Sequence, residues 1–146
     1  MSAAKELFEK GEDLFRKGEN LAALASFEKS FKLDGSNLLC RSYLALLSAT
    51  QRGQLENSMA ASEEIIGQVP GEPLVYLNMA RLYLLAERKQ DAVDMLRKGA
   101  SINNTPEIQQ LLDSMGLRKK PVIPFLSRKN FLNKFLGLLL KRLHLR

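Results

Sequence analysis

The side chains best suited to chemistry in this 146-residue chain are few and widely separated. Cys40 is the only cysteine and His144 the only histidine, so neither an internal disulfide nor a cluster of histidine ligands can form. No histidine lies near Cys40 in the sequence to activate it, and a buried structural thiol is its expected role. Glu63 and Glu64 fit a solvated helix edge rather than an acid–base pair. The chain also lacks a Gly-rich phosphate loop and the HExxH and GxSxG patterns, so we expect no metal, no cofactor and no enzymatic activity.

The charge of the chain is unevenly distributed. Residues 1–117 contain 13 Lys and Arg against 16 Asp and Glu, a net charge of −3, whereas residues 118–146 contain nine basic residues and no acid. Such a basic appendage is typical of a segment that meets an anionic partner. The N-terminus shows no apolar signal-peptide core, and no apolar stretch approaches the roughly 20 residues needed to span a bilayer. We expect a cytoplasmic protein, with attachment to the membrane periphery as the alternative.

The residues that must form the scaffold recur along the chain with a spacing of 34 or 35. Four sets share this spacing: the small residues Gly11, Ala45 and Ala80; the set Ala23, Ser58 and Ala92; the set Phe27, Ser62 and Leu96; and the breaks Gly18, Gly53 and Glu87. Apolar residues between the breaks follow helical spacing. The sequence therefore predicts three units, each a pair of helices.

Small residues near the middle of the paired helices predict close packing within each unit. In the first unit, Gly11 and Ala23 let the helix axes approach, while Leu14 and Phe27 fill the space around the crossing. Three stacked pairs still need a solvating cap at the end. Thr105-Pro106-Glu107 has the features of a helix start, and Gly116 those of a helix end, which predicts this capping helix.

These motifs resemble those of the tetratricopeptide repeat (TPR) family. The first unit matches as Leu7-x2-Lys10-Gly11-x2-Leu14 followed by Ala23-x3-Phe27, and the third as Tyr76-x2-Met79-Ala80-x2-Tyr83 followed by Ala92-x3-Leu96. The middle unit departs from the pattern, with Arg41, Ser48 and Ser62 at aromatic positions, although Pro70 falls at the family's terminal proline. The resemblance covers roughly residues 4–105.

The resemblance implies an all-α fold, a right-handed superhelical solenoid of three TPR helix hairpins with a capping helix and a C-terminal amphipathic helix. The solenoid is expected over residues 4–117, with repeats at about 4–37, 38–72 and 73–105 and the capping helix at 105–116. A basic, proline-containing linker (118–127) and a basic amphipathic helix (128–146) are expected to follow.

The resemblance also implies that the first helices of the units line a concave groove that binds peptides. The groove residues are expected to be Phe8, Glu12, Phe15, Tyr43, Leu46, Leu77, Asn78, Arg81 and Leu84. In the subgroup that grips a chaperone's C-terminal carboxylate, a lysine and an asparagine stand where this chain has Phe8 and Glu12. An apolar peptide or an amphipathic helix therefore fits better. The alternative is that these residues are inter-helix core or are covered by another segment.

The C-terminal helix is expected to carry a broad apolar face that something must cover. Its interaction face comprises Phe131, Leu132, Phe135, Leu136, Leu139 and Leu143. The cover is the chain's own solenoid, a partner protein or a second copy of the chain, or an anionic membrane surface. Nucleic acid fits less well, because the basic residues alternate with leucine rather than with stacking aromatics.

The sequence thus favours a non-catalytic adaptor that binds a protein partner through its groove, its tail helix or both, with self-association left open. The alternative is a membrane-peripheral scaffold anchored to anionic lipid by the basic tail.

Overall fold

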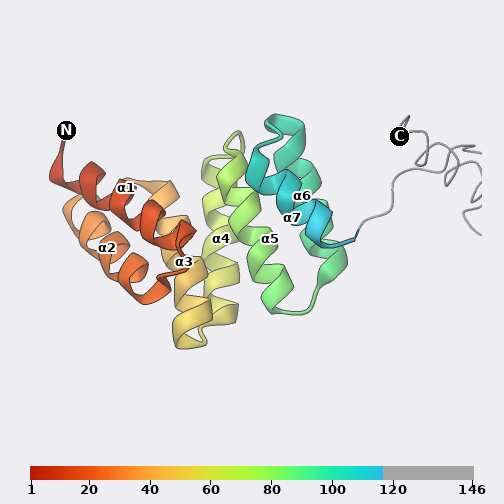
Figure 1. Ribbon diagram of the computed structural model, residues 1–146, viewed down its shortest axis with the longest axis horizontal. Helices are drawn as coiled ribbons and strands as arrows, with labels where there is room; N and C mark the ends of the chain where they lie inside the picture. The colour runs from red at the N-terminus through yellow and green to blue at the C-terminus, as the bar shows by residue number, and fades with distance from the viewer. Residues whose placement is uncertain (117–146) are drawn as a thin grey trace, which may run out of the picture. The chain divides into compact units, whose positions relative to one another are not determined.

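The structure, a computed structural model, describes residues 1–116, and every regular element in this range is an α-helix (Figure 1). The helices are α1 (Ala3–Arg16), α2 (Asn20–Leu33), α3 (Leu38–Arg52), α4 (Leu55–Gln68), α5 (Pro73–Leu85), α6 (Lys89–Ile102) and α7 (Pro106–Ser114). They pack as the consecutive pairs α1–α2, α3–α4 and α5–α6, and α3 also packs against α2 and α5. The described part of the chain is therefore an all-α solenoid of three helix pairs followed by α7. The expected linker (118–127) and C-terminal helix (128–146) lie outside the described residues.

Side-chain caps define where several helices begin. The side chain of Ser2 accepts a hydrogen bond from the Lys5 amide, and Asn37 accepts one from the Cys40 amide at 3.0 Å. These bonds satisfy backbone N–H groups that have no partner inside the helix. Proline occupies the first position of α5, where the missing N–H costs nothing.

The turn between the helices of each pair contains a residue in the left-handed backbone region. Gly18, Gly53 and Glu87 have φ angles of 77°, 68° and 59°. Glycine adopts this conformation freely, whereas a residue with a Cβ is strained there. The third turn therefore keeps the backbone geometry of the other two without the residue that suits it.

Glycine allows close helix packing at two points. A Cβ on Gly11 of α1 would lie 2.7 Å from Cε1 of Phe27 on α2. A Cβ on Gly99 of α6 would lie 3.0 Å from Cδ1 of Ile108 on α7 and 3.3 Å from Cβ of Tyr76. The absence of a side chain thus lets α2 pack on α1 and α7 pack on α6.

Four aromatic rings from α1, α2 and α3 form the core at the junction of the first two pairs. Phe27 is fully buried and stacks on Tyr43, with ring centroids 4.6 Å apart and planes 8° apart. Phe15 meets Tyr43 edge-on at 5.3 Å, and Phe8 lies 5.7 Å from Phe27. Such geometries add specific attraction to the burial of the rings.

The middle helix pair has a more polar interior. Ser58 and Ser62 of α4 are buried at positions where the first unit has Ala23 and Phe27. The hydroxyl oxygen of Ser62 has no hydrogen-bond partner within residues 1–116. A buried hydroxyl in this state reduces stability.

Candidate functional site

A groove with a volume of about 830 Å³ is formed by α1, α3, α5 and α7 together with the loops that precede α5 and α7. These are the first helices of the three pairs and the helix that follows them. The lining residues are Glu12, Phe15, Arg16, Tyr43, Gly71, Glu72, Pro73, Leu74, Leu77, Arg81, Ile102, Asn103, Thr105, Glu107 and Gln110. Aromatic and aliphatic side chains thus alternate with three carboxylates and two guanidinium groups.

Five of the nine residues expected in the groove line it: Glu12, Phe15, Tyr43, Leu77 and Arg81. Phe8 is half-buried in the aromatic cluster, and Leu84 is partly exposed but does not line the groove. The structure places Leu46 and Asn78 in the interior instead of on the groove surface. Leu46 packs with Met79 in the core between α3 and α5, because its side chain points toward the neighbouring helix pair. Leu46 and Asn78 are therefore part of the core between the helices, the alternative given in the sequence analysis.

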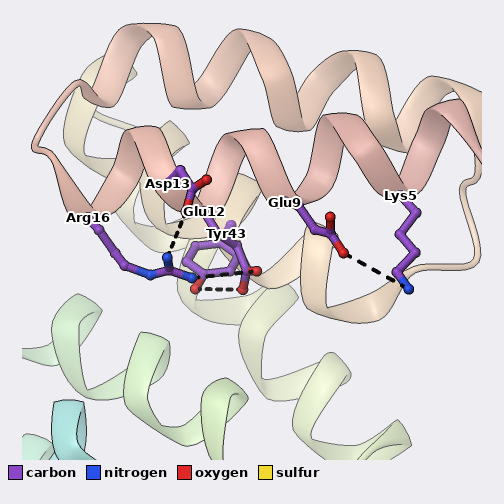
Figure 2. A network of polar contacts seen from close by, with 6 residues as sticks. All are labelled: Lys5, Glu9, Glu12, Asp13, Arg16 and Tyr43. Atoms are coloured by element: carbon purple, nitrogen blue, oxygen red, sulfur yellow. Dashed lines mark hydrogen bonds and ion pairs between the residues drawn. The ribbon is translucent and has the colours of Figure 1, made fainter. Parts of the chain in front are cut away.

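The polar wall contributed by α1 is a network around Glu12 (Figure 2). The hydroxyl of Tyr43 donates a hydrogen bond to Oε1 of Glu12 at 3.3 Å, and Nη2 of Arg16 lies 4.0 Å from Oε2. Nη1 of Arg16 lies 2.7 Å from Asp13, so this guanidinium is engaged mainly by Asp13. Burial raises the pKa of the Glu12 carboxyl, although Arg16 and Tyr43 partly oppose the shift. Burial, together with the charge of Glu12, raises the pKa of the Tyr43 hydroxyl.

The polar wall contributed by α5 is built on a buried amide. Nδ2 of Asn78 donates to the Ser42 hydroxyl oxygen at 3.1 Å, and Oδ1 of Asn78 accepts from Arg81 at 2.8 Å. The Arg81 guanidinium also lies over the ring of Phe15, 5.0 Å from its centroid. Burial lowers the pKa of Arg81, opposed by its attraction to Tyr43 and Glu107. Asn78 therefore does not line the groove but orients the arginine that does.

Several groove residues were not expected from the sequence, namely Ile102 and the residues around the start of α7, including Thr105, Glu107 and Gln110. They were missed because α7 was interpreted as a solvating cap. One signal could have identified them. Pro73 begins α5 and Pro106 begins α7, a separation of 33 residues that is one short of the 34-residue repeat. By this phase α7 is the first helix of a fourth unit, and first helices line the groove.

Cys40 is fully buried in the described fold, and its thiol donates a hydrogen bond to the carbonyl oxygen of Phe27 at 3.3 Å. Burial raises the pKa of this thiol to about 11. A thiol in this environment is protonated at neutral pH and is a poor nucleophile. The structural role expected from the sequence agrees with this placement.

Two further observations concern residues 1–116. No group of three or more His, Cys, Asp or Glu side chains in this range is arranged to hold a metal ion. No helix in the same range combines the length and apolarity that a membrane span requires. The expected interaction face of the tail, Phe131 to Leu143, lies outside the described residues.

Comparison with protein families identifies one match. A family model for the tetratricopeptide repeat matches residues 49–114, which include α4 to α7 and the last turn of α3. No curated protein sequence matches the chain significantly.

Known structures share the fold. The first TPR of Spaghetti (RPAP3), bound to the HSP90 peptide SRMEEVD, is 15% identical with a TM-score of 0.56, over 77% of this chain and 90% of that one. The first TPR domain of human RPAP3 gives 15% identity and a TM-score of 0.59, over 77% and 89% of the two chains. MamA from Desulfovibrio magneticus RS-1 is 16% identical with a TM-score of 0.53, over 97% of this chain and 75% of that one. At these identities the similarity concerns the arrangement of the helices alone.

Proposed function

We propose that this chain, whose residues 49–114 match the tetratricopeptide repeat model, is a non-catalytic adaptor whose groove binds a peptide or a helix of a partner protein. The observation that carries the proposal is the groove of about 830 Å³ between α1, α3, α5 and α7. A concave site in which apolar side chains accompany converging polar groups can bury and orient a ligand. A structural relative, the first TPR of Spaghetti (RPAP3), was solved with a peptide bound, which supports a peptide as the class of ligand.

The apolar residues of the groove favour side chains of the same kind in the ligand. Phe15, Leu74 and Leu77 line its floor, and Ile102 is 42% exposed at its edge. Burying such surface against apolar side chains of a partner contributes about 25 cal/mol per Å². The ligand proposed is therefore an apolar peptide segment, extended or helical.

A matched pair of surface variants tests the groove. Ile102→Asp places a charge at the edge of the groove, whereas Leu33→Asp makes the same kind of change at an exposed residue of α2 that does not line it. Both residues are exposed, so both variants are expected to keep the helical circular dichroism spectrum. Proteins captured from the cell of origin by the full chain should be retained by Leu33→Asp and lost with Ile102→Asp. Retention by both variants would contradict binding in the groove.

The apolar face of the tail is proposed as a second protein-binding surface. Its residues include Phe135 and Leu139, which occupy one face of the helix expected over residues 128–146. Replacing both with Asp in the full chain should change either the free energy of unfolding or the mass measured by light scattering. If both quantities stay at their wild-type values, the face contacts neither its own solenoid nor a second copy.

Attachment to an anionic membrane is the second candidate function. The observation that favours it is the composition of residues 118–146, with nine basic residues and no acid. Each Lys or Arg close to an anionic surface adds about 1 kcal/mol of attraction. The full chain should co-sediment with phosphatidylserine-containing vesicles at low salt, and deletion of residues 118–146 should abolish this. A full chain that stays in the supernatant would exclude the candidate.

A further inference from the structure

One carboxylate on the groove wall is only weakly compensated by the surrounding protein. The Glu12 side chain is 24% exposed, and within residues 1–116 its Oε2 lies 4.0 Å from its nearest cation, Nη2 of Arg16. That cation is 63% exposed and makes a much closer contact, at 2.7 Å, with Asp13. Exposed ion pairs of this kind stabilise a charge little, because solvent screens them and the flexible side chain must be held in place.

Arg81, the other basic residue of the groove, does not compensate the charge of Glu12. Arg81 lies over the ring of Phe15 and is bound to Asn78, and the acid that attracts it is Glu107. Arg16 is the only cation in the described fold that perceptibly lowers the pKa of Glu12, and burial outweighs it. The Glu12 carboxylate is therefore partly desolvated, and a further cation would stabilise its negative charge.

Two aromatic residues line the groove together with this carboxylate. Phe15 and Tyr43 both line the groove, with ring centroids 5.3 Å apart and planes at 63°. The Tyr43 hydroxyl is hydrogen-bonded to Glu12, which fixes the carboxylate beside the ring (Figure 2). A carboxylate held in a partly dry site offers an ammonium or guanidinium group a charge-assisted hydrogen bond.

We propose that Glu12, Phe15 and Tyr43 form a subsite for a Lys or Arg side chain of the peptide that occupies the groove. The inference rests on the proposed peptide binding and specifies the ligand as an apolar segment with a basic side chain. Charge complementarity agrees: three carboxylates and two guanidinium groups line the groove, and residues 1–117 carry a net charge of −3.

The direct test is a peptide array probed with the full chain. A short leucine- and alanine-rich peptide is synthesised with a single Lys, Gln or Glu stepped through every position, so that one register places the variable residue at Glu12. The best Lys peptide and its Gln and Glu counterparts are then measured by fluorescence anisotropy. We expect the Lys peptide to bind about tenfold more tightly than the Gln peptide, the ratio typical of one charge-assisted contact.

Three variants of α1 identify the residue responsible. Glu12→Gln retains an acceptor for the Tyr43 hydroxyl and should remove the preference for Lys. Arg16→Gln removes the competing cation and should increase the preference severalfold. The matched control is Glu9→Gln, the same change one turn away at a residue that does not line the groove, and it should leave the preference unchanged.

The outcomes separate this inference from the proposed function. Equal binding of the Lys and Gln peptides, or a Lys preference that survives Glu12→Gln, would overturn the subsite. If in either case Ile102→Asp still weakens binding of all the peptides, the groove remains the binding site. If no peptide in the array binds, both the subsite and the apolar peptide ligand are contradicted.

Discussion

Gly11 lies so close to the ring of Phe27 that a Cβ at residue 11 would approach three ring carbons to between 2.7 and 2.9 Å. Phe27 is fully buried and also stacks on Tyr43, so its ring cannot move away without disturbing a groove residue. The contact between α1 and α2 is thus coupled to the groove through one aromatic ring.

Gly11→Ala should destabilise the protein by about 1–3 kcal/mol, because overpacking forces either the ring or a helix to shift. Urea denaturation followed by circular dichroism measures the change. The matched control is Gly67→Ala in α4, where a Cβ would meet no atom within 4 Å. Gly67→Ala should raise the free energy of unfolding by up to about 1 kcal/mol, since alanine has a higher helix propensity than glycine. Equal effects of the two substitutions would contradict the close packing.

Ser62→Ala should raise the free energy of unfolding by about 1 kcal/mol, because it removes a buried hydroxyl that has no partner in the described fold. Ser42→Ala is the opposite case. The Ser42 hydroxyl accepts a hydrogen bond from Asn78, so its removal leaves a buried amide donor unpaired and should cost about 1–3 kcal/mol. Chemical denaturation measures the free energy of unfolding of both variants. Destabilisation by Ser62→Ala would show that the Ser62 hydroxyl makes a hydrogen bond.

Glu87→Gly should stabilise the turn between α5 and α6. Glu87 has a φ of 59°, in a region that costs a residue with a Cβ about 1–2 kcal/mol, and part of this is offset by the greater freedom of glycine when unfolded. A gain of about 0.5–1 kcal/mol is expected in thermal or urea unfolding. The reverse change, Gly18→Ala, has open space around its Cβ and should destabilise through the backbone alone. A loss of stability in Glu87→Gly would contradict the left-handed turn.

Glu12 makes stability depend on pH in a defined direction. Burial holds its pKa above the ordinary value of 4.5 in the folded state, so the folded protein binds this proton more tightly than the unfolded chain. The free energy of unfolding contributed by Glu12 therefore falls as the pH rises from about 4.5 through the raised pKa. Relative to wild type, Glu12→Gln should be more stable at pH 7 than at pH 4, as measured by urea denaturation at each pH. A difference that is constant with pH would contradict the shift.

The sequence predicted the helix pairs well because three independent signals agree. The spacing of 34 or 35 residues, the helical periodicity and the turn residues agree, and Gly18, Gly53 and Glu87 lie between the paired helices of the structure. Gly18 and Gly53 identified two turns through their backbone preference. Glu87 has no such preference, and only its place in the repeat marked the third turn.

The groove was harder to predict than the helices, because groove and core residues lie about one-quarter of a helix turn apart. Leu77 and Asn78 are neighbours in sequence and both are buried, yet Leu77 lines the groove and Asn78 does not. A polar residue is normally expected on a surface. Asn78 is buried because Ser42 and Arg81 satisfy its amide, and these partners come from α3 and from one turn later on α5. Sequence periodicity alone does not reveal such pairings.

The burial of the four groove helices differs sharply between the centre and the ends. The central helices α3 and α5 each bury seven residues, whereas α1 buries Gly11 alone and α7 buries Ile108 alone. Within residues 1–116 the helices α1 and α7 lie at the two ends, and stacked repeats open most easily from their ends. The floor of the groove is therefore better buried than its two ends. We therefore expect hydrogen exchange to be slower in α3 and α5 than in α1 and α7.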